Sequence, residues 1–102
     1  MLAQVSIFPL DKGESIGKFV AEAVNEIDKS GLDYRVTAMS TVVEGEWEPV
    51  MKVLKKMREK LLKHSKRVYM IISIDDRQGD RRRRIESKVK SVEQILGKSL
   101  RK

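Results

Sequence analysis

The sequence predicts an α+β domain: a ferredoxin-like β-α-β-β-α-β sandwich with an additional C-terminal helix. Four short stretches carry the apolar pattern of strands, and two stretches between them carry apolar residues at helical spacing. Their order is that of the split β-α-β unit. A third helical pattern follows the last strand. With 102 residues and no internal linker or repeat, the chain is predicted to form a single domain over residues 1–102.

A change of apolar period predicts the first strand and the first helix. Ala3, Val5 and Ile7 alternate with polar or outward-facing positions, and Pro9 ends this strand. Apolar residues then recur at helical spacing, and Gly31 is a natural helix stop. The helical set consists of Ile16, Phe19, Val20, Ala23, Val24 and Ile27.

A pair of strands and a second helix are predicted next. The alternation over residues 34–39 indicates a second strand. Thr41 to Glu44 indicates a third, close enough behind to form a hairpin or a bulged continuation. A helix follows, and its first turn tolerates Pro49. Its apolar positions are Trp47, Val50, Met51, Leu54, Met57 and Leu61.

The last strand and the last helix follow from an apolar run and a third periodic stretch. Residues 68–74 are almost wholly apolar, which is typical of a strand covered on both faces. Asp80 is a candidate cap near the start of the third helix. The apolar positions of this helix are Ile85, Val89, Val92 and Leu96.

One face of the predicted sheet has no obvious cover, because both crossover helices pack on the other. It is too apolar to lie comfortably in water and too polar for an ordinary core. We expect another copy of the chain, the third helix or a ligand to cover it, with a homodimer or homotetramer as first choice. Alternation places on this face Gln4, Ser6, Phe8, Arg35, Thr37, Met39, Tyr69, Ile71 and Ser73.

Composition narrows the functional classes. The chain is 40% hydrophobic and 36% charged, as in a soluble globular protein, and it has no cysteine. It has no apolar run long enough for a membrane helix and no signal-peptide pattern at its start, so we expect a cytoplasmic protein without membrane partners. His64 is the single histidine, which makes a metal site improbable.

The net charge of +7 favours anionic partners. Arg77 and the run Arg81–Arg84 could form an anion or nucleic-acid binding module. The stacking aromatics of RNA-binding domains of this fold are absent from the central strands, so nucleic acid is a minor alternative. Asp75 and Asp76 are adjacent on a strand and face opposite ways, so they form no acid–base dyad. No set of residues indicates catalysis, and we predict a protein that is not an enzyme.

Hydroxyls and a carboxylate gather around the second and third strands. Thr37, Ser40 and Thr41 offer three hydroxyls, and Glu44 adds a carboxylate within one hairpin. Such a group could hydrogen-bond the ring edge of a flat heterocycle, and the carboxylate would favour positive charge on it. Gly45 is expected to supply a turn conformation that other residues avoid.

These stretches resemble a known family, the small thiamine-binding domain proteins, over nearly the whole chain. The resemblance rests on residues 7–10 (IFPL), 31–34 (GLDY), 37–45 (TAMSTVVEG) and 72–77 (ISIDDR). It implies a ferredoxin-like fold and assembly into dimers and often tetramers. It also implies that thiamine or its pyrimidine moiety binds near the sheet and the subunit boundary. Residues that match the family pattern directly are Thr37, Thr41, Glu44, Gly45, Asp75 and Arg77.

We therefore predict a non-enzymatic protein that binds thiamine or a related pyrimidine such as hydroxymethylpyrimidine as a ligand and not as a catalytic cofactor. Hydroxyls would donate hydrogen bonds, an apolar wall would face the ring, and a carboxylate would face its positive charge. A ligand-free structural oligomer and the arginine-based anion site are the alternatives. The predicted ligand-binding residues are Ser6, Phe8, Thr37, Met39, Ser40, Thr41, Glu44, Asp75 and Arg77.

Overall fold

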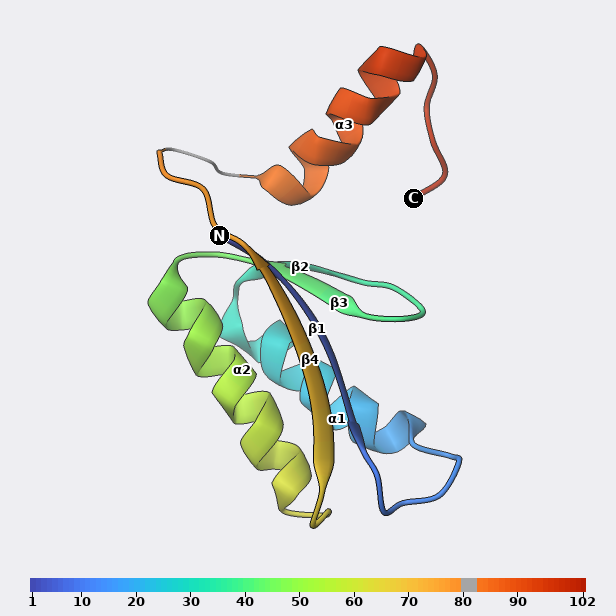
Figure 1. The fold of residues 1–102 in the computed structure, drawn as a ribbon, viewed down its shortest axis with the longest axis vertical. Helices are drawn as coiled ribbons and strands as arrows, with labels where there is room; N and C mark the ends of the chain where they lie inside the picture. The colour runs from blue at the N-terminus through green and yellow to red at the C-terminus, as the bar shows by residue number, and fades with distance from the viewer. Residues whose placement is uncertain (80–82) are drawn as a thin grey trace.

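A computed structural model, which describes residues 1–79 and 83–102, confirms the predicted fold class (Figure 1). Four antiparallel strands form one sheet in the order β2-β3-β1-β4. Two helices connect the strands and a third follows them. The elements are β1 (Leu2–Pro9), α1 (Gly17–Ser30), β2 (Asp33–Val36), β3 (Thr41–Glu44), α2 (Trp47–Leu62), β4 (Val68–Asp75) and α3 (Arg84–Leu96).

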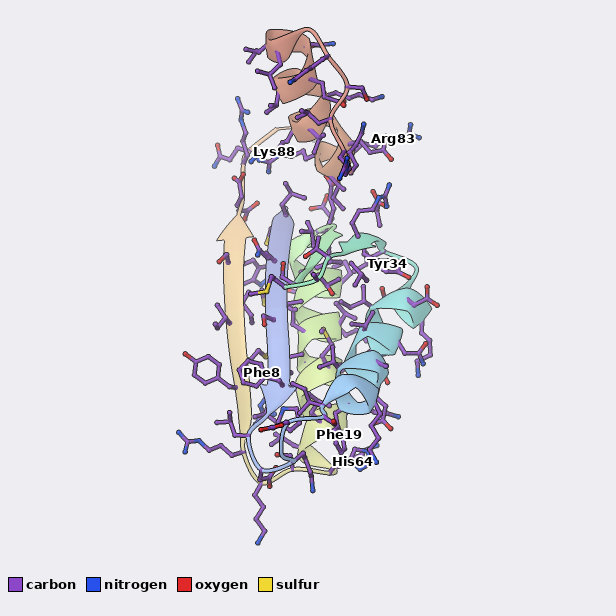
Figure 2. The ribbon with its side chains drawn as sticks, turned by 90° about the vertical axis from the view of Figure 1, so that its right-hand side faces the viewer. Phe8, Phe19, Tyr34, His64, Arg83 and Lys88 are labelled. Atoms are coloured by element: carbon purple, nitrogen blue, oxygen red, sulfur yellow. The ribbon has the colours of Figure 1, made fainter. Side chains whose placement is uncertain are left out.

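The core lies between the sheet and the two crossover helices. Helices α1 and α2 cover one face of the sheet, and none of the helices in the described part of the chain covers the other face (Figures 1 and 2). Helix α1 ends at Gly31, whose φ of 78° is the left-handed conformation expected of a helix stop. The buried apolar side chains of the core are Ala3, Val5, Ile7, Ala23, Ile27, Val43, Val50, Val53, Leu54, Met57 and Leu61.

The strand register decides which residues share a face. Val5 of β1 lies opposite Thr41 of β3 and Ile72 of β4, so all three belong to the face that the helices cover. Leu2 lies opposite Glu44 and Asp75, which therefore belong to the open face. Strands β2 and β3 form a hairpin, which is one of the two expected arrangements. The second strand predicted over residues 34–39 is too long, because β2 ends at Val36 and residues 37–40 form the turn.

The hairpin is shorter than the strand beside it. Strand β3 pairs with β1 from Leu2 to Val5, whereas β4 pairs with β1 over its whole length from Leu2 to Pro9. Beyond Val5, no strand within residues 1–79 and 83–102 pairs with the edge of β1 that faces the hairpin. Among these residues, the second half of β1 therefore has a neighbouring strand on the β4 side only.

The prediction that β4 is covered on both faces is wrong for the single chain. Strand β4 lies at the edge of the sheet, and four of its large apolar side chains are 41–51% exposed. They occupy both faces of the strand, because residues alternate sides along it. In this chain the continuous apolar run is thus an edge strand with exposed apolar side chains on both faces. The side chains concerned are Tyr69, Ile71, Ile72 and Ile74.

Helix α3 lies beyond the end of the sheet and does not cover its open face (Figure 1). The predicted third helix is present and contains the four predicted apolar positions, but it does not cover the open face. The predicted cap Asp80, and Arg81 and Arg82 of the arginine run, lie outside the described residues. Among the described residues, the cap of α3 comes from β3.

Glu44 is that cap. Its two carboxylate oxygens accept hydrogen bonds from the backbone N–H groups of Arg84 (2.9 Å) and Ile85 (3.2 Å). A carboxylate at a helix N-terminus satisfies otherwise unpaired donors and complements the helix dipole. The Arg84 guanidinium, in a residue only 7% exposed, bonds to the Asp75 carboxylate and to its main-chain carbonyl. Two carboxylates thus hold α3 at the end of the sheet.

We expect acid to detach α3 before it unfolds the core. Hydrogen bonds from Lys88 and then Arg84 hold the pKa of Asp75 below its usual value. Because the folded pKa is the lower one, the attachment is fully present above the unfolded value of about 3.9 and is lost as the pH falls through the folded pKa. An acid titration followed by amide NMR should shift the Ile85 signal before that of Ile27. Simultaneous loss of both signals would contradict this order.

Gly45 is required for space and not for an unusual turn. Its φ lies outside the left-handed region, contrary to our expectation. A Cβ at this position would lie 2.9 Å from a methyl carbon of Leu32 and 3.3 Å from one of Val50. The chain must therefore pass closely over these side chains on its way from β3 to α2.

Candidate functional site

A pocket of about 210 Å³ opens where the hairpin stops short of the end of β1; we call it the edge pocket. It brings together six of the nine predicted ligand-binding residues from β1, β3 and the β2–β3 turn. These six are Ser6, Phe8, Thr37, Met39, Ser40 and Thr41. The other residues around the edge pocket are Val5, Ile7, Ile16, Val20, Val24, Val36, Ala38 and Met57.

Helices α1 and α2 contribute the apolar floor of the edge pocket. Helix α1 buries Ala23 and Ile27 fully against the sheet. Val20 and Val24 lie on the same helix but are only partly buried, because the short hairpin leaves no strand above them. The helical spacing in the sequence indicates that these two valines are core residues. Only the end of pairing at Val5 reveals that they face a pocket.

The rim is the turn of residues 37–40, and Thr37 holds it together. The Thr37 hydroxyl donates a hydrogen bond to the carbonyl of Ser40 (2.9 Å). It also accepts one from the backbone N–H of Ser40 (3.1 Å) and a longer one from that of Met39 (3.3 Å). The Ser40 hydroxyl accepts a hydrogen bond from the amide of Gln4 (2.9 Å). These two hydroxyls thus shape the turn, and Met39 at its tip is 84% exposed.

Two other hydroxyls are available to a ligand. Within residues 1–79 and 83–102, the side chains of Ser6 and Thr41 form no hydrogen bond, although Thr41 is only 4% exposed. The ring of Phe8 stacks on Tyr69 on the open face, with centroids 5.5 Å apart. The edge pocket therefore combines an apolar floor, an aromatic at its border and two free hydroxyls, which is the usual make-up of a small-molecule site.

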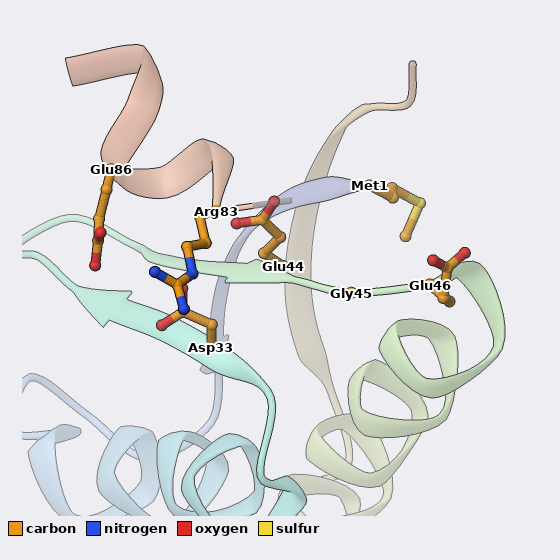
Figure 3. A pocket seen from close by; sticks show the side chains of 7 residues that line it. All are labelled: Met1, Asp33, Glu44, Gly45, Glu46, Arg83 and Glu86. Atoms are coloured by element: carbon orange, nitrogen blue, oxygen red, sulfur yellow. The ribbon is translucent and has the colours of Figure 1, made fainter. Parts of the chain in front are cut away.

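A second and wider cavity, which we call the acidic cavity, lies where α3 meets the sheet (Figure 3). Its volume is about 560 Å³. Four carboxylates and one guanidinium surround it, and in Figure 3 the Arg83 side chain points toward Asp33. Its residues are Met1, Asp33, Glu44, Gly45, Glu46, Arg83 and Glu86.

The remaining three predicted site residues do not line the edge pocket. Glu44 lies in the acidic cavity, where its carboxylate is already engaged by α3. Asp75 lies at the end of β4 and binds Arg84 and Lys88. Arg77 is exposed beyond that strand. Charge and hydroxyl groups that are close in sequence are thus separated, because Thr41 and Glu44 lie on opposite faces of the sheet.

The single histidine belongs to a contact between helices. Its Nε2 lies 3.0 Å from a carboxylate oxygen of Glu22, and its ring packs at a tilt against Phe19 (Figure 2). Within the described part of the chain, no three potential metal-binding side chains of His, Cys, Asp or Glu are grouped together. His64 therefore joins the end of α2 to α1.

Comparison with known proteins yields a consistent result. The model of a family described as thiamine-binding protein matches residues 3–93. A UPF0045 protein of Methanocaldococcus jannaschii is 35% identical over 95 residues, which are 93% of this chain and 94% of the relative. A UPF0045 protein of Mycobacterium bovis is 38% identical over 80 residues, 78% of each chain.

Solved structures agree in fold. The crystal structure of the M. jannaschii hypothetical protein has a TM-score of 0.82 and covers 89% of this chain and 93% of its own. A Thermotoga maritima protein proposed to serve thiamine biosynthesis or salvage has a TM-score of 0.78 at 26% identity. That match covers 89% of this chain and 96% of the other. Among the described helices, none is long and apolar enough to cross a membrane.

Proposed function

This chain belongs to the thiamine-binding protein family, and we propose that it is a non-catalytic protein that binds thiamine or its pyrimidine moiety in the edge pocket. The observation that carries the proposal is the meeting of six predicted ligand residues around one pocket. Two of them, Ser6 and Thr41, present free hydroxyls.

The size of the edge pocket favours one ring. Pockets that enclose drug-sized ligands measure roughly 300–1,000 Å³, and the edge pocket measures about 210 Å³. A substituted pyrimidine would fill it, whereas the second ring of thiamine would extend past Met39 toward solvent. We therefore expect hydroxymethylpyrimidine to fill the edge pocket by itself. In a single copy of the chain, the second ring of thiamine should add little to the affinity.

The apolar floor also argues against an anionic ligand at this site. Among the residues that the structure describes, no Lys or Arg side chain lines the edge pocket, so these residues offer no counter-charge to a phosphate or nucleic acid. The alternative anion site would have to use Arg77 and the arginine run instead. Its affinity would fall steeply with salt, whereas binding of one neutral ring would not.

The test is calorimetric titration of the purified protein with thiamine and with hydroxymethylpyrimidine, each at low and at high salt. We expect saturable binding of both ligands, with little change in affinity between the two salt concentrations. Inorganic pyrophosphate is the control for an anion site. Absence of heat with both ring ligands, together with salt-sensitive pyrophosphate binding, would overturn the proposal in favour of the arginine site.

We further propose that a second copy of the chain pairs with the edge of β4. Seven residues from Val68 to Ile74 contain no charge, which is unusual for a free edge strand because charges normally prevent such edges from pairing. Two copies of β4 can pair antiparallel about a two-fold axis, and the exposed isoleucines of the two copies would then pack side by side across the strand pair.

A lysine on this edge should yield a monomer. Ile72→Lys places a charge on the helix-covered face of β4, where the side chain is 41% exposed. Val92→Lys introduces the same charge at an exposed position of α3 and is the control. Sedimentation velocity should show an oligomer for the wild type and for Val92→Lys, and a monomer for Ile72→Lys. A monomeric wild type would contradict the pairing.

A further inference from the structure

The unpaired edge of β1 carries main-chain groups as well as side chains. Strand β3 stops pairing at Val5, but β1 continues through Pro9 alongside β4. A strand without a neighbour leaves N–H and C=O groups that need partners. Ile7 lies in this unpaired stretch and also lines the edge pocket.

Known hydrogen bonds fix the direction of these groups. The backbone N–H of Leu10 donates to Arg67 on the β4 side (2.9 Å), whereas the carbonyl of Met1 accepts from Gly45 on the β3 side (3.1 Å). Main-chain groups of successive residues in a strand point to opposite sides. Odd-numbered residues of β1 therefore point toward the hairpin, and Ile7 points its N–H and C=O to the side where β3 has ended.

Neither group of Ile7 has a backbone partner on that side within residues 1–79 and 83–102. Pro9, the next residue in the same direction, has no N–H to offer. Val5, the previous one, is paired with Thr41. The edge pocket thus presents one main-chain donor and one main-chain acceptor from a single residue, next to the Thr41 hydroxyl.

We propose that the N–H and C=O of Ile7 recognise the ring edge of an aminopyrimidine, which takes the place of the missing strand. The inference rests on the proposed function and specifies what that site selects. A ring nitrogen accepts from the N–H of Ile7, and the exocyclic amino group donates to its C=O. Thr41 contributes a hydroxyl from the end of β3.

The chemistry predicts which rings are rejected. If the amino group is missing, the carbonyl of Ile7 loses its donor. An oxo group in place of the amino group would put two acceptors face to face. A site that pairs a buried polar group with its ligand discriminates strongly against a ligand that lacks the matching group. Removal of one such hydrogen bond corresponds to about a tenfold loss of affinity.

The first part of the test needs no ligand. Amide hydrogen exchange of the free protein should show faster exchange at Ile7 than at Val5, its matched control on the same strand. Equal protection of the two amides would show that the Ile7 N–H already has a partner, and would overturn the proposal.

The second part adds hydroxymethylpyrimidine and the same ring without its amino group. The aminopyrimidine should slow exchange at Ile7, shift its amide signal and bind about tenfold more tightly than the other ring. Equal affinity for the two rings, or binding that leaves the Ile7 signal unmoved, would overturn the main-chain contact while the proposed function stands. Failure of the aminopyrimidine and of thiamine to bind would overturn both.

Discussion

Replacement of Leu61 by alanine is expected to destabilise the protein by about 2–5 kcal/mol. Leu61 lies near the end of α2, is fully buried and belongs to the core that joins both helices to the sheet. The loss combines the transfer free energy of the removed methyl groups with the cost of the cavity that they leave. In a domain of this size the loss is a large part of the total stability. Urea denaturation followed by far-UV circular dichroism measures it.

The neighbouring leucine is the matched control. Leu62 is on the same turn of the same helix but is 38% exposed. Leu62→Ala should cost well under half as much, because less apolar surface is removed from the interior. Equal destabilisation by the two variants would contradict the position of the core between α2 and the sheet.

Val20→Phe is expected to weaken ligand binding at least about tenfold, which corresponds to roughly 1.4 kcal/mol. Val20 belongs to the floor of the edge pocket, and a larger side chain there would occupy the space of the ring. The phenyl group would extend into the space of the pocket, so we expect little effect on folding. Equilibrium dialysis with labelled thiamine measures the affinity.

The control for this variant is Val92→Phe, the same substitution at an exposed position of α3. It should bind thiamine as the wild type does. If both variants bind normally, the ring does not enter the edge pocket. If both lose binding, the effect does not come from the pocket floor.

The fold was predictable because its signals are local. The alternation of Ala3, Val5 and Ile7 and the helical spacing of Ala23 and Ile27 both mark the core face that the structure shows. The edge position of β4 is not predictable from its apolar run, because a buried strand and an apolar edge strand have the same composition. Its exposure appears only once the strand order is known.

The candidate site was predictable in part. The hydroxyl cluster around Thr37 was found because its residues are adjacent in the sequence. Separation of Glu44 from that cluster was missed, because opposite faces of a strand differ by a single residue step. The proposed hydrogen bonds of Ile7 use its main-chain N–H and C=O, so its side chain gives no indication of them in the sequence. They depend on where the pairing of β3 ends, which is a property of the register.

We propose that the edge pocket, and not the acidic cavity, holds the ring. The most direct test is one set of calorimetric titrations with hydroxymethylpyrimidine on wild type, Thr41→Val and Glu46→Gln. Each variant alters one polar group of one cavity with almost no change in size. We expect roughly three- to tenfold weaker binding by Thr41→Val, and wild-type binding by Glu46→Gln. Unchanged affinity in Thr41→Val together with a loss in Glu46→Gln would contradict this proposal and move the site to the end of the sheet under α3.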